Sequence, residues 1–289
     1  MTDKTEKTQS FVERGTLYVV ATPIGNLSDM TERAKQVLSE VDFVAAEDTR
    51  VSGKLLNLYG ISGSMVNYFE HNKREMGEKI LMRLRNGESC ALVTDAGTPA
   101  ISDPGEDLCA LCHENGVKVV PIPGCCAAIA ALSASGMPSR RFSFEGFLPR
   151  EKKEMAEVLE DCKNEKRTLL FYEAPHRLSK TLAALYDALG DRELCLCREL
   201  TKRNEEIVRT TLKGAIALYE TTEPRGEYVL IVAGCPEKSG DAAFWENLSI
   251  EEHVGFYEAQ GMKRMDAIKA AAKDRGVSKN EIYKEMLPK

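Results

Sequence analysis

The first part of the chain alternates short apolar runs with longer amphipathic segments. Runs of β-branched and aliphatic residues occupy 16–22 and 91–93, and a loop containing Gly and Pro follows each of them. Segments such as 30–41 place apolar residues at helical spacing, which predicts amphipathic helices between the strands. Short strands that alternate with helices favour a mainly parallel sheet with helical crossovers. We therefore predict an α/β fold.

Polar clusters follow the predicted strands, with the sequences PIGN, EDTR, FEHN, TDAGTP and PIPG. The carboxyl ends of parallel strands meet at one edge of a sheet, where open α/β sheets place their ligands. The loop 94–105 offers backbone groups, the hydroxyls of Thr98 and Ser102, and the carboxylates of Asp95 and Asp103. These groups suit a flat, polar ligand such as a nucleoside. A tight connection with a proline at the start of the next helix explains the loop equally well.

The composition of the chain changes at GMPSRRFSFEGFLPREKK, which is basic and aromatic and is interrupted by Pro and Gly. It changes again after residue 236. The last segment contains a helix, a Gly-Val-Ser turn and a second helix, the cadence of a helix-turn-helix. A helical hairpin packed on the body is the alternative. We predict a disordered tail at 1–14, an N-terminal α/β domain at 15–124, a C-terminal α/β domain at 125–236 and a helical appendage at 237–289.

Composition limits the classes of function. A net charge of -6 argues against a nucleic-acid coat, so any RNA contact must use a local basic patch. The nine cysteines are scattered through apolar segments, and no apolar run approaches the length of a membrane span. We expect reduced thiols in a cytoplasmic protein that does not cross a membrane. Cys109 and Cys112 have the spacing of half a zinc site, but no second pair follows, so we predict no metal.

Several longer motifs together resemble a known family. VVATPIGNLSDMT, AAEDTR, DAGTPAISDPG, FEGFLP, FYEAPHR, RELTK and GEYVLIVAG occur in this order over 17–234. The chain resembles the tetrapyrrole methylase superfamily and, within it, the cytidine 2'-O-methyltransferases of 16S ribosomal RNA. The resemblance implies two α/β domains with an S-adenosylmethionine cleft between them, a homodimer, and methyl transfer to a cytidine ribose in the decoding region. The implied substrate is the assembled small ribosomal subunit.

The same resemblance implies a set of cofactor-binding residues. The first loop of the superfamily falls on 21–26, and its Gly-Asp-Pro motif falls on 97–99, where Thr98 replaces the acid. Asp95 is our hypothesis for the carboxylate that binds the ribose hydroxyls. The implied cofactor-binding residues are Pro23, Ile24, Gly25, Asp95, Ala96, Gly97, Thr98, Ile101, Cys126, Ala127, Tyr172 and Glu173.

A ribose hydroxyl needs a positioned base before it becomes a good nucleophile. Glu47 and Asp48 stand with Arg50 at one strand end, where an ion-paired loop is the alternative interpretation. Glu173 and His176 stand at another, where a capped helix start is the alternative. The candidate bases are Glu47, Asp48, His71, Glu173, His176 and Glu199, and we favour Glu47, Asp48, Glu173 and His176 as catalytic.

Basic and aromatic residues interleave where the composition changes. Cations flank three phenylalanines, with Arg140, Arg141, Arg150, Lys152 and Lys153 around Phe142, Phe144 and Phe147. This mixture suits single-stranded RNA, although a solvated boundary with the aromatic rings in the core is also possible. The predicted RNA-binding residues are Arg50, Arg140, Arg141, Arg150, Arg177, Arg198 and Lys202.

Two other functions stay open at this point. The first is a methyltransferase of the same superfamily that acts on a tetrapyrrole or another small molecule. The second is a non-enzymatic RNA-binding assembly factor that keeps the cofactor fold. The EDTR, FYEAPHR and RELTK motifs and the helical tail favour RNA methylation over both.

Overall fold

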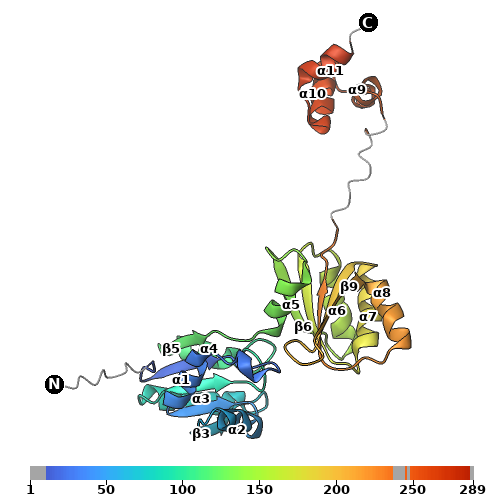
Figure 1. The fold of residues 1–289 in the computed structure, drawn as a ribbon. Helices are drawn as coiled ribbons and strands as arrows, with labels where there is room; N and C mark the ends of the chain where they lie inside the picture. The colour runs from blue at the N-terminus through green and yellow to red at the C-terminus, as the bar shows by residue number, and fades with distance from the viewer. Residues whose placement is uncertain (1–10, 237–244, 246–247, 287–289) are drawn as a thin grey trace, which may run out of the picture. The chain divides into compact units, whose positions relative to one another are not determined.

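The computed structural model describes residues 11–236, 245 and 248–286, and Figure 1 shows the fold. The chain forms two compact units, of which the first ends at Cys235 and the second begins at Pro236. Two β-sheets with their helices make up the first unit, and the described part of the second contains helices alone. The predicted α/β class with a helical C-terminal segment is therefore confirmed.

The first sheet has five parallel strands in the order β3-β2-β4-β1-β5. Its strands are β1 (Thr16–Val20), β2 (Phe43–Ala46), β3 (Ser64–Asn67), β4 (Cys90–Val93) and β5 (Lys118–Ile122). The connections contain the 3-10 turn η1 (Leu27–Asp29) and the helices α1 (Glu32–Glu40), α2 (Thr49–Leu58), α3 (Lys73–Arg85) and α4 (Glu106–Glu114). This is the parallel sheet that the alternating pattern predicts.

Both faces of the first sheet are buried. Along β1, Leu17 packs into a cluster with residues of α3 and α4, whereas Tyr18 and Val20 pack with residues of α1 and α2. Successive side chains of a strand point to opposite faces, so this alternation requires helices on both sides of the sheet. With both faces covered, the loops at the carboxyl ends of the strands are where polar chemistry can be placed.

The second sheet also has five strands, in the order β6-β7-β10-β8-β9. β6 and β7 are parallel, and the other neighbours are antiparallel. The strands are β6 (Phe142–Phe147), β7 (Thr168–Glu173), β8 (Glu193–Arg198), β9 (Glu206–Thr211) and β10 (Tyr228–Val232). The helices are α5 (Ala127–Ser135), α6 (Lys152–Lys163), α7 (Leu178–Leu189) and α8 (Leu212–Thr221).

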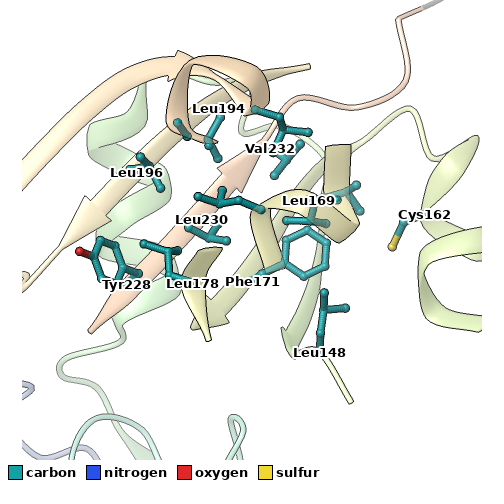
Figure 2. Close-up of a cluster of buried hydrophobic side chains, with 14 of the residues drawn as sticks. Leu148, Cys162, Leu169, Phe171, Leu178, Leu194, Leu196, Tyr228, Leu230 and Val232 are labelled. Carbon is teal, nitrogen blue, oxygen red and sulfur yellow. The ribbon is translucent and has the colours of Figure 1, made fainter. Parts of the chain in front are cut away.

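Helices cover both faces of the second sheet as well. Figure 2 shows the larger core, in which Leu169, Leu196 and Leu230 of the strands lie with Leu178 of α7. These four side chains are almost completely buried, and each stabilises the fold by roughly 1.5–3 kcal/mol relative to an exposed leucine. The opposite face packs against Ala131 and other residues of α5.

Two strands of this sheet were not predicted. The punctuated stretch expected to mark a boundary contains β6, whose register with β7 shifts between Phe144 and Gly146. Gly146 has φ 64°, a conformation that favours glycine, and this irregularity disguises the strand in the sequence. β9 is an edge strand, and its side chains are exposed or partly exposed, so it lacks an apolar pattern.

The expectation of a disordered tail over 1–14 does not hold for residues 11–14, and 1–10 lie outside the described residues. The backbone N–H of Phe11 donates to Glu40 at 2.9 Å, and that of Glu13 donates to the hydroxyl of Tyr18 at 2.7 Å. The carboxylate of Glu13 also pairs with Lys118 of β5 at 2.7 Å. These contacts hold residues 11–14 against the first sheet.

The second unit contains α9 (Ile250–Ala259), α10 (Arg264–Arg275) and α11 (Lys279–Glu285) around a small core that includes Val254, Ile268 and Ile282. Gly276 ends α10 in the left-handed conformation, and Ser278 forms a capping box with Glu281 at the start of α11. The helix-turn-helix cadence of the sequence thus corresponds to two packed helices. Among the described residues, no helix is long and apolar enough to span a membrane.

Candidate active site

A cavity of about 350 Å³ lies where loops of the first sheet meet the second sheet. The first sheet contributes the loops that follow β1, β2 and β4, and the second contributes the ends of β7, β8 and β10. Cys126 and Ala127 at the start of α5 complete the wall. Small-molecule sites in proteins have volumes of roughly 300–1,000 Å³, so this cavity can hold a single small molecule.

Hydrogen bonds join the first-sheet loops to one another. Thr22 and Gly97 form a two-residue bridge, in which each backbone N–H donates to the other residue's carbonyl at 2.8 and 3.1 Å. The Thr22 hydroxyl donates to the carbonyl of Thr94 at 3.2 Å, and the Thr98 hydroxyl donates to that of Cys125 at 2.8 Å. These bonds fix the loops after β1, β4 and β5 as one rigid group.

Gly97 has a backbone conformation that few other residues adopt. Its φ is 90°, and a Cβ built there would lie 3.4 Å from Cγ2 of Ile24. The glycine therefore permits both the conformation and the close approach of two loops.

Backbone strain is concentrated at the same place. In the described part of the chain, the non-glycine residues with positive φ are Ala100 (68°), Ser102 (61°), Glu199 (50°) and Thr201 (67°). The first two belong to the loop after β4, and the other two to the connection between β8 and β9; Ser102 and Glu199 line the cavity. Such conformations are unfavourable by about 1 kcal/mol or more, and they cluster at active sites and ligand clamps.

Aromatic side chains form the second-sheet wall. The hydroxyl of Tyr172 accepts the backbone N–H of Ala128 at 3.0 Å, and its ring meets Phe144 and Phe147 edge to face at 5.0 and 5.6 Å. Burial raises the pKa of Tyr172 well above its ordinary value, so the phenol is neutral. The wall is therefore apolar, with one hydroxyl whose contact fixes the start of α5.

Lys202 connects the two sides of the cavity. Its aliphatic stem lies across Gly25, where a Cβ would come within 2.4 Å of the lysine Cγ. Its Nζ contacts Glu199 at 2.8 Å and Glu227 at 2.9 Å. Burial lowers the pKa of Lys202, but the two carboxylates outweigh it and raise the pKa above its ordinary value, so the ammonium stays charged.

The lining of the cavity is strongly acidic. Six carboxylates and one lysine line it: Glu47, Asp95, Asp103, Glu173, Glu199 and Glu227, with Lys202. Burial, and then the charge of Glu47, raises the pKa of Asp103 to about 6 and that of Asp95 above its ordinary value. This charge balance favours a cationic ligand and disfavours a polyanion such as a nucleoside triphosphate.

The favoured catalytic residue Glu173 has its carboxylate fully occupied. Its side chain is 0% exposed. It accepts hydrogen bonds from the N–H of Ala174 at 2.8 Å and from the hydroxyl of Thr181, and it forms an ion pair with Arg177 at 3.5 Å. These three contacts attach the end of β7 to the start of α7. The carboxylate of Glu173 is therefore already engaged by partners within the protein.

Unlike Glu173, Asp48 and His176 lie apart from the lining. Asp48 caps α2 by accepting the N–H of Arg50 at 2.8 Å, and it pairs with the guanidinium of Arg50 at 2.7 Å. These hydrogen bonds lower the pKa of Asp48 to about 2, which makes it a weak base. His176 and His71 are exposed and line no part of the cavity, whereas Glu47 does. The alternative interpretation of an ion-paired loop fits Asp48, whereas the start of α7 has no side-chain cap hydrogen bond of the kind that the other alternative requires.

The predicted cofactor-binding residues gather at the cavity. All of them line it except Pro23 and Gly25, which flank the lining residue Ile24. The sequence did not single out Thr94 or, on the second sheet, Cys197, Tyr228 and Val229. The last three belong to apolar strands, in which a cavity-facing residue looks the same as a core residue.

The predicted RNA-binding residues fall into two groups. Four are engaged within the protein: Arg50 with Asp48, Arg177 with Glu173 and the carbonyl of Leu148, Arg198 with Glu206 at 3.0 Å, and Lys202 as above. The structure gives Arg140, Arg141 and Arg150 no ion pair within the described ranges, and all three are exposed. These three are the cations free to meet an external anion.

The cysteines are all free thiols, and the described residues contain no cluster of three or more His, Cys, Asp or Glu side chains able to hold a metal ion. Taken together, the acidic lining, the apolar wall and the rigid glycine-containing loop give the cavity the features of a site for a small organic cation.

Residues 16–216 match the family of Tetrapyrrole (Corrin/Porphyrin) Methylases, and the chain belongs to this family of methyltransferases. It is 50% identical over 272 residues to Ribosomal RNA small subunit methyltransferase I of Halalkalibacterium halodurans, covering 94% of each chain. It is 47% identical over 273 residues to the Bacillus subtilis protein of the same name, again covering 94% of each. The family predicted from the motifs is thereby confirmed.

Solved structures share the fold at lower identity. Diphthine synthase matches with a TM-score of 0.59 at 14% identity, covering 75% of this chain and 90% of that one. Uroporphyrin-III C-methyltransferase from Thermus thermophilus, complexed with S-adenosylhomocysteine, matches with a TM-score of 0.53 at 20% identity, covering 75% and 97%. Both support the fold of two β-sheets covered by helices.

Proposed function

We propose that this protein transfers a methyl group from S-adenosylmethionine to the 2'-hydroxyl of a cytidine in 16S ribosomal RNA. The observation that carries the proposal is the identity of about half of all residues, over 94% of both chains, with a protein named Ribosomal RNA small subunit methyltransferase I. The position on the ribose and in the decoding region follows from the motif resemblance.

The cavity fits this cofactor. S-adenosylmethionine carries a sulfonium and an ammonium against one carboxylate, so its net charge is positive and suits an acidic lining. Gly97 and Thr98 would form one side of its site, Asp95 would bind its ribose hydroxyls, and Tyr172 and Ile101 would cover its apolar parts. When bound, the cofactor supplies a methyl group activated by the positive sulfur.

The protein's own contribution is orientation and proton removal. Displacement at the methyl carbon needs the acceptor oxygen in line with the breaking bond, and such positioning can supply roughly 7–11 kcal/mol of the barrier. The cross-linked loops after β1, β4 and β5 are rigid enough for this purpose. The hydroxyl also needs a proton acceptor, which the acidic side of the cavity offers.

RNA would bind outside the acidic cavity, since the carboxylates repel phosphates. Exposed Arg140, Arg141 and Arg150 lie close in sequence to Phe147, which is 50% exposed and also lines the cavity. Phosphates would contact the arginines, and a base could stack on the ring. A target nucleotide would thereby reach the cavity mouth while its neighbours stay outside.

The remaining features of the proposal come from the resemblance and the thiols. We infer a homodimer that works on the assembled small subunit in the cytoplasm. All nine cysteines are unpaired in the structure, which suits a reducing compartment. Light scattering of the purified protein tests the dimer.

A transfer assay with labelled S-adenosylmethionine tests the function. The acceptors are small subunits that lack 2'-O-methylation, naked 16S RNA, and a tetrapyrrole, each in a separate reaction. We expect label in the RNA of the subunits and none in the tetrapyrrole. Label in the tetrapyrrole alone would replace the proposal with small-molecule methylation, and cofactor binding without transfer to any acceptor would also contradict it.

A further inference from the structure

The hydroxyl of Thr94 lies between two cavity carboxylates. It donates to Glu47 at 2.9 Å, and it is also hydrogen bonded to Asp103. Thr94 directly follows β4 and is 2% exposed, so water does not compete for its hydroxyl. A hydroxyl carries one proton and two lone pairs, and it can therefore donate to one carboxylate while accepting from the other.

Opposing effects act on the charge of Asp103. The hydrogen bond with Thr94 lowers the pKa of Asp103, whereas burial and the charge of Glu47 raise it and outweigh the hydrogen bond. An ionised Asp103 faces Glu47 across the Thr94 hydroxyl, and the two negative charges repel. These surroundings therefore favour Asp103 once it has accepted a proton.

The other cavity carboxylates are less suited to accept a proton. Glu173 is saturated by three partners, and Glu199 and Glu227 share the ammonium of Lys202. Asp95 is hydrogen bonded to the backbone of Asp48. Asp103 also belongs to the loop in which Ala100 and Ser102 have positive φ, so strain in the backbone serves to place this carboxylate.

We propose that Asp103 accepts the proton of the acceptor hydroxyl during methyl transfer, that Thr94 positions it, and that the charge of Glu47 stabilises its protonated form. This inference rests on the proposed function. The acceptor oxygen forms a bond to the methyl carbon as the carbon–sulfur bond breaks, and the electron pair of that bond stays on sulfur. The hydroxyl proton moves to an Oδ of Asp103, which later releases it to water, so charge and atoms balance.

Several charged and titratable groups face Asp103. Glu47 follows β2 and Asp95 follows β4, and both disfavour the ionised form of Asp103. The phenol of Tyr172 faces it from β7, and the only lysine of the lining, Lys202, is engaged by Glu199 and Glu227. Burial and the two acidic neighbours raise the pKa of Asp103 to about 6, close to the working pH that a base requires.

Single-turnover transfer to small subunits at saturating cofactor tests the inference. Asp103→Asn should slow transfer by about 10²–10⁴-fold, the range of a lost general base, and leave the calorimetric Kd for S-adenosylmethionine within about threefold. Thr94→Val and Glu47→Gln should slow it less, by about tenfold, because the proton acceptor itself remains. The wild-type transfer rate should decrease as the pH drops below about 6. Glu47→Gln should shift this decrease to lower pH.

Matched controls separate this role from a general loss of structure. Thr168→Val removes another buried strand hydroxyl, one that donates to the carbonyl of Pro138 at 2.7 Å, and Glu106→Gln removes an exposed carboxylate nearby in the sequence. Both should keep the wild-type rate. Carbon-13 NMR of labelled aspartate measures the titration of Asp103 independently of methyl transfer. The titration should shift to lower pH in Glu47→Gln.

The two proposals fail in different ways. If the wild type transfers no methyl group to RNA, the proposed function fails and this inference falls with it. If the wild type is active and Asp103→Asn keeps its rate, or loses only cofactor affinity, the assignment of Asp103 alone is wrong. An Asp103 signal that titrates at the ordinary aspartate pH would likewise overturn it.

Discussion

The first sheet reaches the cavity through the loops that follow its strands, whereas the second sheet reaches it through strand ends, aromatic side chains and the loop that contains Glu199 and Lys202. The parallel sheet brings Glu47, Asp95 and Asp103 together because every one of its strands ends at the same edge. The mixed sheet supplies Tyr172 and Phe147 as a wall. The two sheets thus contribute differently: the first supplies the carboxylates around the proposed proton acceptor, and the second supplies the aromatic wall and the ion pairs of Lys202.

The largest expected effect comes from the first-sheet loop. In Gly97→Val the side chain collides with Ile24 and cannot keep φ at 90°, so the loop must shift. A misplacement of about 1 Å can slow a reaction by about 10²-fold, and we expect a loss of that size in the methyl-transfer rate. Gly116→Val is the control, because Gly116 also has positive φ but a Cβ there meets nothing within 4 Å. Equal losses of activity in the two variants would contradict a particular importance of the Gly97 loop for methyl transfer.

The second-sheet wall should respond in stability rather than in chemistry. Tyr172→Phe leaves the backbone N–H of Ala128 without its acceptor, which costs about 1–3 kcal/mol of unfolding free energy. Urea unfolding measures this loss, and Tyr186→Phe on the opposite face of the sheet should show none. A loss of single-turnover rate far larger than the loss of stability would mean that Tyr172 takes part in the reaction.

The contact between the two sides can be measured as a coupling. Gly25→Ala should destabilise the protein because its Cβ meets the stem of Lys202, and Lys202→Ala should relieve part of that loss. We expect the loss of unfolding free energy in the double variant to be smaller than the sum of the two single losses by about 1 kcal/mol. Additive losses would show that the stem and the glycine do not meet in solution.

The smallest effect is a pH dependence of stability. The folded-state pKa of Asp103 is about 6 against 3.8 ordinarily, so the folded protein binds this proton more tightly than the unfolded chain, and stability falls as pH rises from about 4 to 6. Asp103→Asn removes this loss and should be more stable than wild type at pH 8, by about 1 kcal/mol after allowance for solvent screening. Thermal unfolding at pH 4 should show no such gain. A variant less stable at both pH values would contradict the raised pKa.

The sequence predicted the first sheet and its cavity edge well, because strands covered on both faces are compact apolar runs and their polar ends stand out. It predicted the second sheet less completely. β6 is interrupted by Gly146, and β9 lies at an edge, so neither shows a clean pattern. The roles of single carboxylates could not be predicted, since Glu47 and Glu173 follow or end similar strands. Only their partners, Thr94 for one and Ala174, Thr181 and Arg177 for the other, distinguish them.

Mass-spectrometric mapping of the methylated nucleoside tests directly whether the protein methylates a ribose hydroxyl of the small-subunit RNA. Wild-type protein, S-adenosylmethionine and unmethylated small subunits are incubated together, and the RNA is then digested to nucleosides. We expect one 2'-O-methylcytidine per subunit, formed much more slowly by Asp103→Asn than by Glu106→Gln. A methyl group on a base nitrogen or carbon, or equal rates for the two variants, would contradict a cavity built to remove a proton from a ribose hydroxyl.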